Sequence, residues 1–242
     1  LARYHDQYLY VGRNNPGFEG KRGGANDSDP DNFVEATQWD NRADLEFGYL
    51  LPVGHGADDD SIVNRYVIQN GLLKSGVTGG ESWNPLESGR SYLKLTPQWR
   101  QQTLGNEELE VPLETLNLEV ALERDNRDFP FNPSFGSFQR VAYKRDFTHD
   151  EVLGEWDCWS FEYAKFIDLK PNGAMKQQVL ALDLWTAYVP SWETAVVDGR
   201  EVTVQRPPPY EGATLGGLHR MRAFENERFQ DAAGVYYAAE YR

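Results

Sequence analysis

The sequence has almost no cysteine and no long apolar segment, and each shortage excludes a class of protein. Cys158 is the only cysteine in 242 residues, so an internal disulfide framework is excluded and a zinc site is disfavoured. No apolar run approaches the roughly 20 residues that a membrane-spanning helix needs. Membrane-spanning strands remain possible, because they alternate between an apolar and a polar face and average to a polar mean hydropathy, here −0.66.

Positive charge is also scarce, since 24 Lys and Arg stand against 38 Asp and Glu, for a formal net charge of −14. A chain without a basic stripe cannot neutralise a phosphate backbone, so nucleic acid is not expected as a partner. The acidic runs at 58–60 and 26–29 indicate solvated loops. The glycine and glutamate that complete an EF-hand calcium loop do not follow them at the required spacing.

Motifs for catalysis or cofactor binding are missing as well. The four histidines have no metal-ligand spacing; they are His5, His55, His149 and His219. No G-x-S-x-G sequence is present that could place a nucleophilic serine. The sequence therefore predicts no metal, no cofactor and no catalytic residue, and the chain is not expected to be an enzyme.

What the sequence does contain is strict alternation, which predicts an all-β fold of about eight antiparallel strands of membrane-spanning length. The strongest period-2 signal has Leu116, Leu118, Val120 and Leu122 on one face, opposite Asn117, Glu119, Ala121 and Glu123 on the other. Further strands are predicted at 4–12, 43–51, 62–73, 141–147, 159–169, 179–188 and 232–242. Residues 92–103, interrupted by Pro97, are predicted to form an extension outside the main body.

The predicted connections are sorted by length. Short ones lie near 54–59, 129–137 and 170–177, and long ones at 13–40, 74–113, 148–157 and 189–231. Short turns at one end of the strands and long loops at the other are typical of an outer-membrane β-barrel. Aromatic residues make up 13% of the chain, and Trp159, Tyr163 and Tyr188 are interpreted as interfacial girdle residues. Lys165 interrupts this apolar face, and its stem is expected to snorkel to the nearer boundary.

The C-terminal stretch 210–242 is predicted to be a long loop followed by one strand. Leu215, Gly216 and Gly217 form a flexible turn in which the glycines can adopt positive φ with little steric cost. The loop then carries two cation–aromatic groups, which are Met221-Arg222-Ala223-Phe224 and Arg228-Phe229, and ends at Asp231. In the strands, Asp183 and Glu240 fall on the charged, inward face.

Two stretches resemble the BamA/TamA-type outer-membrane assembly superfamily, also called the bacterial surface-antigen family. The segment 123–136 is similar to the family's "D-T-R-D-N-P-F-N-P-x-x-G" strand end and periplasmic turn; the matching residues are Asp125, Arg127, Asp128, Pro130, Asn132, Pro133 and Gly136. The segment 215–242 is similar to "L-G-G-x-x-x-[VL]-R-G-[FY]…R-F-x-D…EYR", the sixth extracellular loop and the strand after it. Ala223 departs from this pattern, because the family usually has Gly there.

The resemblance implies that the chain forms the middle of a sixteen-stranded transmembrane barrel, without its first strands, its last strands and any POTRA domains. It implies an outer-membrane protein of a Gram-negative bacterium that takes part in inserting outer-membrane proteins or in polypeptide transport. Its partners would be the lipid bilayer, unfolded client proteins and periplasmic accessory proteins. It also implies that Arg222 pins the loop inside the lumen, with Asp183 or Glu240 as local candidates for its partner. The alternative for Arg222 is a solvated loop arginine.

Two other functions remain open from the sequence. One is a barrel that anchors or translocates a fused passenger, such as a patatin-like lipase. The other is a soluble β-sandwich that binds or cleaves carbohydrate with Trp and Asp or Glu side chains. The chain begins at Leu1 without an initiator Met, so either a processed precursor or a fragment is expected.

Overall fold

The computed structural model describes nine segments of the chain: residues 2–10, 33–59, 63–105, 110–148, 154–170, 175–197, 200–222, 224 and 228–242. These residues contain strands, turns and one short 3-10 turn, η2 (Gly54–Ala57), and no α-helix. In this part of the chain no helix has the length and apolar character needed to cross a membrane. The predicted all-β, antiparallel fold is therefore confirmed.

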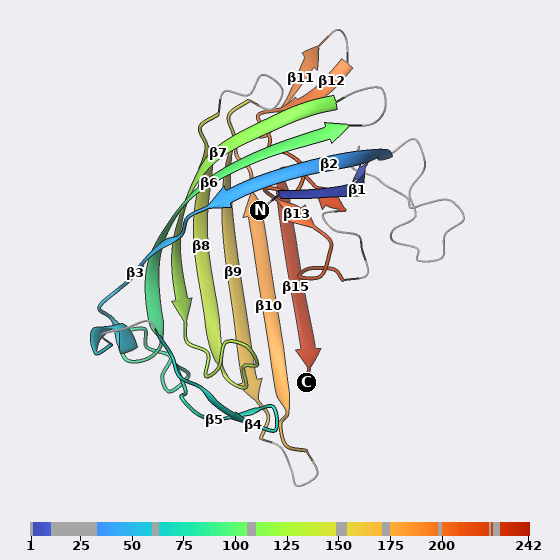
Figure 1. Cartoon of the computed structure of the whole chain (residues 1–242). Helices are drawn as coiled ribbons and strands as arrows, with labels where there is room; N and C mark the ends of the chain where they lie inside the picture. Colours follow the sequence, from blue (N-terminus) through green and yellow to red (C-terminus); the bar gives the residue numbers. More distant parts are fainter. Residues whose placement is uncertain are drawn as a thin grey trace.

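One large curved antiparallel sheet dominates the structure (Figure 1). Its strands are bonded in the order β1-β2-β6-β7-β8-β9-β10-β15, with β3 also paired to β6. Their bounds are β1 (Ala2–Tyr10), β2 (Phe33–Asp44), β3 (Phe47–Leu50), β6 (Arg90–Gly105), β7 (Glu110–Asp125), β8 (Gly136–Asp146), β9 (Asp157–Asp168), β10 (Val179–Tyr188) and β15 (Ala233–Tyr241). The described strands do not close into a barrel, because no pairing joins β1 to β15.

Pro97 lies inside β6, so its assignment to an extension outside the main body was wrong. The partner strands β2 and β3 keep one register along β6, from Asp44 opposite Gln98 to Phe47 opposite Leu95. The break between β2 and β3 lies opposite Pro97, which has no N–H to donate to the ladder. Its carbonyl still accepts a hydrogen bond from the Leu45 N–H at 3.1 Å. One ladder bond is lost and the sheet continues.

The two faces of this sheet differ in polarity. We call inner the face that the connection 189–232 lies against, and outer the opposite face. Along β7 the outer side chains Leu116, Val120 and Leu122 are 49%, 41% and 54% exposed, whereas Thr115 and Asn117 on the inner face are buried. The exposed apolar side chains of the outer face are Trp39, Leu45, Phe47, Tyr49, Leu93, Leu95, Trp99, Leu116, Val120, Leu122, Val141, Phe147, Trp159, Ile167, Leu182, Leu184, Tyr188, Val235, Tyr237 and Tyr241.

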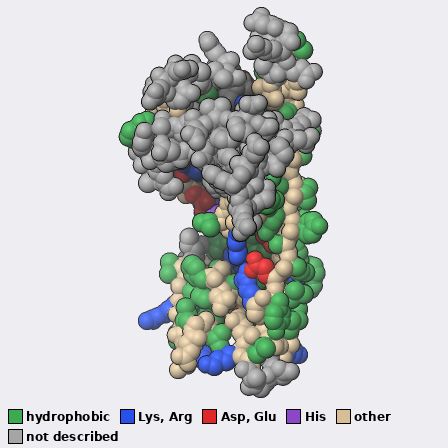
Figure 2. All heavy atoms as spheres, turned by 90° about the vertical axis from the view of Figure 1, so that its right-hand side faces the viewer, with side chains coloured by type: hydrophobic (Ala, Val, Ile, Leu, Met, Phe, Trp, Pro, Cys, Tyr) green, Lys and Arg blue, Asp and Glu red, His purple; other side chains and the backbone are tan. Residues whose placement is uncertain are grey.

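The side-on view in Figure 2 follows the same division. Hydrophobic side chains gather along the right-hand flank of the molecule, and charged side chains show in the recess beside them. Soluble antiparallel sheets usually bury the apolar face and leave the polar face in water. The polarity of this sheet is the reverse, as the alternation of the sequence predicted.

The connections are sorted by length less cleanly than predicted. At the lower end of the sheet in Figure 1, β3 and β6 are joined by a long connection, 51–89, instead of a short turn at 54–59. The strand predicted at 62–73 is wrong. That region instead holds a separate hairpin of β4 (Val67–Gln69) and β5 (Leu72–Ser75). Its turn is Asn70-Gly71, both at positive φ, the residue pair that favours a tight hairpin turn.

At the upper end, β6 ends at Gly105 and β7 begins at Glu110. The prediction of a long loop at 74–113 is therefore also wrong. Part of the loop predicted at 13–40 belongs to β2, which begins at Phe33, and residues 11–32 lie outside the described residues. The connection 189–232 contains short strands that the alternation did not reveal. They are the pair β11 (Glu193–Val197) and β12 (Arg200–Val204), and the pair β13 (Thr214–Leu215) and β14 (Phe229–Gln230).

Candidate functional site

The inner face carries alternating charges that link neighbouring strands. Lys94 Nζ on β6 lies 3.3 Å from the carboxylate of Glu46 and 3.1 Å from that of Glu123 on β7. Arg140 on β8 donates to Glu119, and its Nε lies 3.8 Å from Glu123. Arg140 lies directly opposite Glu123 in the strand register, whereas Lys94 reaches Glu123 and Arg140 reaches Glu119 diagonally. The charges of the inner wall are therefore largely compensated across strands, which a confined, partly desolvated surface requires.

The connection 189–232 adds an acid to this wall. Glu211 accepts hydrogen bonds from Arg100 Nη1 at 3.3 Å and from Asn117 Nδ2 at 3.1 Å, and lies 3.7 Å from Lys144 Nζ. Arg100 also forms a two-pronged pair with Asp40 at 2.9 and 3.0 Å. The Glu211 side chain is only 9% exposed. One loop carboxylate thus contacts β6, β7 and β8 at once.

Apolar packing holds the same connection against β9 and β10. Val189 and Ala213 of the connection are buried with Trp156, Cys158 and Trp185. Pro207 and Pro208 are also fully buried, and the Gln230 amide donates to both of their carbonyls, at 3.3 and 3.0 Å. These buried side chains exclude water. They form a small packed core on the upper part of the inner face.

Arg220 also attaches this connection to the inner wall. Its guanidinium carbon lies 4.2 Å from the centre of the Trp185 ring on β10, and its Nη2 lies 3.5 Å from Glu162 on β9. Burial lowers the pKa of the Arg220 guanidinium, and the nearby carboxylates of Glu162 and Asp183 oppose that shift. The sequence did not single out Arg220.

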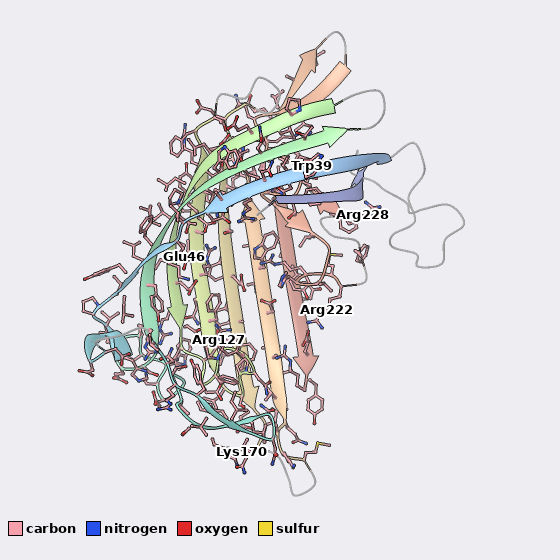
Figure 3. The ribbon with its side chains drawn as sticks, in the orientation of Figure 1. Trp39, Glu46, Arg127, Lys170, Arg222 and Arg228 are labelled. Atoms are coloured by element: carbon pink, nitrogen blue, oxygen red, sulfur yellow. The ribbon has the colours of Figure 1, made fainter. Side chains whose placement is uncertain are left out.

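The residues of the predicted loop motif lie further along the same connection (Figure 3). Met221 adopts a positive φ of 61°, and Arg222 Nη2 lies 3.3 Å from Glu240 on β15. The Arg222 side chain is 68% exposed, so this pair is a surface contact. Ala223 lies outside the described residues. Arg222 and Glu240 are thus brought together, while Asp183 faces the Arg220 side of the loop.

The second half of the motif is packed. Arg228 is 3% exposed, and its guanidinium lies 4.9 Å from the centre of the Phe229 ring. Phe224 and Phe229 are in edge contact, with ring centres 5.1 Å apart. Asp231 accepts from the Ala232 N–H at 2.7 Å and donates its own N–H to the Ala213 carbonyl. These contacts close the loop before β15.

The turn Leu215-Gly216-Gly217 has the backbone that the sequence predicted. Gly216 and Gly217 have φ values of 124° and 91°, in the region that favours glycine. The Gly217 N–H donates to the Phe224 carbonyl at 3.2 Å. This bond ties the start of the loop motif to its end.

The turn between β7 and β8, at the lower end of the sheet, is held by its own polar groups. Arg127 pairs with Asp125 at 2.6 Å and donates to the Pro130 carbonyl at 3.3 Å. Asp128, 3% exposed, accepts the N–H groups of Ser134 and Phe135. Desolvation raises the pKa of the Asp128 carboxyl, and these backbone hydrogen bonds lower it by less.

Of the remaining motif residues in this turn, Pro133 is buried, Pro130 and Asn132 are half-buried, and Gly136 has a φ of 100°. A Cβ at position 136 would lie 2.0 Å from the Asn126 carbonyl oxygen. The backbone segments on the two sides of the turn therefore approach each other so closely at position 136 that only glycine fits.

The long connection 51–89 covers this turn, which the sequence did not predict. The Thr78 hydroxyl donates to the Arg127 carbonyl at 3.0 Å, and the Gly80 N–H donates to Asn126 Oδ1 at 2.9 Å. Buried Ser88 donates to the same Asn126 oxygen at 2.8 Å. The lower end of β7 and β8 is thus capped by an ordered segment instead of lying open.

Within the described ranges, no group of three or more His, Cys, Asp or Glu side chains could hold a metal ion. His55 Nε2 lies 3.0 Å from Glu81, and its Nδ1 lies 3.2 Å from the Thr78 carbonyl. Its role is therefore to join two parts of the connection 51–89.

Comparison of the chain with protein-family models finds no matching family, and comparisons with curated proteins and with solved structures likewise find no match.

Proposed function

We propose that this chain forms part of a transmembrane β-barrel in the outer membrane of a Gram-negative bacterium. The observation that carries the proposal is the reversed polarity of the main sheet. Large apolar side chains are exposed on the outer face from β6 through β10 to β15, and most of the charged side chains of these strands face the other way. A contiguous exposed apolar surface of this kind is rare on a soluble monomer. It is the expected exterior of a membrane barrel.

Aromatic side chains support the placement in a bilayer. On the upper part of the outer face, the rings of Tyr143 and Trp159 lie 4.7 Å apart, and Tyr188 is opposite Trp159 in the register. Tyr237 and Tyr241 lie further down, on β15, and are 82% and 63% exposed. Amphipathic rings near both ends of an apolar band correspond to the two girdles of a membrane barrel.

We further propose that the barrel belongs to the BamA/TamA-type assembly superfamily and is not an enzyme. Two arrangements support this, in addition to the resemblance of the motifs. The segment 125–136 connects two adjacent strands, and the described residues Arg220 and Arg222 of the loop contact the inner side of β9, β10 and β15. In this reading the loop fills part of the lumen, and Arg222 with Glu240 is one of its attachments to the wall.

The function that follows is insertion of outer-membrane proteins, or transport of polypeptide across the outer membrane. In such a barrel a weakly paired seam would open laterally, and its edges would template an incoming strand through backbone hydrogen bonds. The partners would be the outer-membrane bilayer, unfolded barrel proteins or passengers, and periplasmic accessory proteins. A role as an anchor for a fused passenger would use the same barrel but would not require the seam to open.

The proposal is tested with the intact protein in its native membrane. It predicts that the protein fractionates with outer membranes and migrates differently in gels with and without heating, because a folded barrel resists denaturation by detergent. A native protein that stays in solution without detergent would contradict it. That outcome would favour the soluble carbohydrate-active sandwich.

A further inference from the structure

Near the lower end of the sheet, part of the connection 51–89 folds onto the outer face. Arg124, on the outer face of β7, donates to the carbonyls of Trp83 and Ser88 at 3.3 and 3.1 Å. Ser91 and Ser137 share the parity of outer-face residues on their strands, yet they are only 8% and 6% exposed. The segment 81–88 is therefore held against this side of the sheet and covers its lower margin.

This segment presents two large apolar side chains outward. Trp83 is 78% exposed and Leu86 is 70% exposed. Neither is exposed for lack of local order, because Asn84 and Glu87 tie the turn between them. Asn84 Oδ1 accepts the Leu86 N–H at 3.1 Å, and its Nδ2 donates to Glu87 at 2.8 Å. Hydrogen bonds from Ser82 and Asn84 also lower the pKa of the Glu87 carboxyl.

Two cations flank Trp83, and neither has an acidic partner among the described residues. Arg124 contacts two backbone carbonyls and the Gln139 amide oxygen at 3.4 Å. Lys165, on the outer face of β9, has its Nζ 5.9 Å from the centre of the Trp83 ring. Another outer-face cation, Arg145, is paired with Glu155 at 3.0 Å. In a chain with a net charge of −14, two neighbouring cations without a carboxylate indicate an anion from elsewhere.

The position along the strand matches a membrane boundary. Lys165 is six residues from Trp159 on β9, or roughly 20 Å along the strand at about 3.3 Å per residue. With a strand tilt of about 40° this is roughly 15 Å along the membrane normal. The apolar band of an outer-membrane barrel is about 25 Å tall and is bounded by aromatic girdles. With Tyr143 and Trp159 at the upper boundary, Lys165 starts in the lower half of the band, and its long stem extends beside Trp83 toward the lower boundary.

We propose that Trp83, Leu86, Arg124 and Lys165 form a lipid-binding anchor for the phosphate of an anionic phospholipid at the lower membrane boundary. Trp83 and Leu86 lie between the headgroups and the acyl chains, and Lys165 extends along the Trp83 ring to reach the phosphate. Arg124 holds the segment in place and adds its charge. The inference rests on the proposed membrane barrel, and it assigns a role to a connection that the resemblance does not cover.

A lipid fits this surface better than a protein partner because the surface continues the outer apolar face. The exposed side chains of β9 and β10, such as Ile167 and Leu182, lie on the same face as Lys165. A protein bound here would have to cover an apolar face that the bilayer already covers. The uncompensated cations also match the negative headgroups of one leaflet.

The anchor is tested on the protein reconstituted into vesicles of phosphatidylcholine and phosphatidylglycerol. Lys165→Gln is compared with Arg145→Gln, which removes the same charge from an outer-face cation that is already paired, and with Lys165→Arg. Native mass spectrometry of the detergent-extracted protein then measures the retained phosphatidylglycerol. We expect about a fivefold loss in Lys165→Gln, which corresponds to roughly 1 kcal/mol for one cation near the surface. Arg145→Gln and Lys165→Arg should retain the lipid, and added inorganic phosphate should not displace it.

A second readout locates Trp83. Phosphatidylglycerol with brominated chains should quench the tryptophan fluorescence of the wild type more than that of a Trp83→Phe variant. Equal quenching in both proteins, together with unchanged lipid retention in Lys165→Gln, would overturn the anchor while leaving the barrel intact. That outcome would indicate that the segment faces water or a protein. A protein that does not float with the vesicles at all would overturn the membrane barrel itself, and the anchor with it.

Discussion

The Arg220 guanidinium lies 4.2 Å from the centre of the Trp185 ring. This stack joins the long connection before β15 to the upper part of the inner face. Glu162 Oε2 lies 3.5 Å from Nη2 of the same guanidinium. Arg220 contacts both a ring and a carboxylate and its side chain is 28% exposed, so it is attached more firmly than a cation in a surface pair. Arg220 is therefore a stronger attachment point for this loop than Arg222.

Replacing Arg220 with Ala is expected to loosen the connection 189–232. The free energy of unfolding in vesicles should fall by about 1–2 kcal/mol, because the cation–π contact and the Glu162 pair are both lost. Protease should also cut the connection faster. The control is Arg222→Ala, which removes an exposed pair with Glu240 and should cost about 0–1 kcal/mol. If Arg222→Ala lowered stability as much as Arg220→Ala, the claim that Arg220 is the stronger attachment would be contradicted.

Replacing Glu211 with Gln is expected to lower the free energy of unfolding by about 2–3 kcal/mol. The substitution removes the charge that Arg100 and Lys144 share at a nearly buried position. Glu211→Ala should cost more, because the acceptor for Asn117 also disappears. Glu193→Gln, on the exposed strand β11, is the control and should change stability little. Urea titration of the refolded protein measures the free energy of unfolding of all three variants. Equal losses in Glu211→Gln and Glu193→Gln would contradict a stabilising role for the Glu211 contacts.

Gly136→Ala is expected to destabilise the turn between β7 and β8 by more than about 2 kcal/mol. The added Cβ would meet the Asn126 carbonyl, and the positive φ would strain any other residue. Gly48→Ala in β3 is the matched control, since a Cβ there meets nothing within 4 Å. Thermal or urea unfolding of the two variants should separate them clearly. Equal stabilities would contradict the tight approach seen at position 136.

Asp128 is expected to make stability depend on pH in an unusual direction. Its pKa is raised in the fold by desolvation, so its contribution is fully present below the unfolded pKa of about 4 and is lost as pH rises through the folded pKa. Asp128→Asn keeps an acceptor for the Ser134 and Phe135 N–H groups and removes the charge. Its free energy of unfolding relative to the wild type should therefore increase between about pH 3 and pH 7. A difference that stays constant, or decreases, over that range would contradict the sign.

Much of the main sheet could be predicted from alternation alone. The apolar residues from Leu116 to Leu122 were predicted on one face, and the structure exposes that face. Period 2 is a local property of the backbone, so a strand and its orientation can be inferred without knowing its neighbours. The turn at 215–217 was also predictable, because paired glycines indicate positive φ.

The errors arose where a neighbour decides the outcome. Pro97 would break an isolated ladder, but its missing N–H lies opposite the point where β2 ends and β3 begins. The hairpin of β4 and β5 was mistaken for one strand, although Asn70-Gly71 was the signal for its turn. Glu211 could not have been found, since its partners Arg100 and Asn117 lie 111 and 94 positions earlier in the chain.

The membrane barrel is tested most directly by comparing two introduced cysteines in a Cys158→Ser background. Leu122→Cys places a thiol on the outer face of β7, where Leu122 is 54% exposed. Asp58→Cys places one on the exposed surface of the connection 51–89. Both side chains are open in the protein alone, so only a bilayer can distinguish them.

In intact outer membranes, a water-soluble maleimide should label Asp58→Cys readily and leave Leu122→Cys unreacted. A thiol in hydrocarbon stays protonated and out of contact with the reagent. Denaturing the membrane sample with detergent and heat should then expose Leu122→Cys to the same reagent. Rapid labelling of Leu122→Cys in the untreated membrane would contradict a lipid-facing outer surface, and with it the proposal that this sheet spans a membrane.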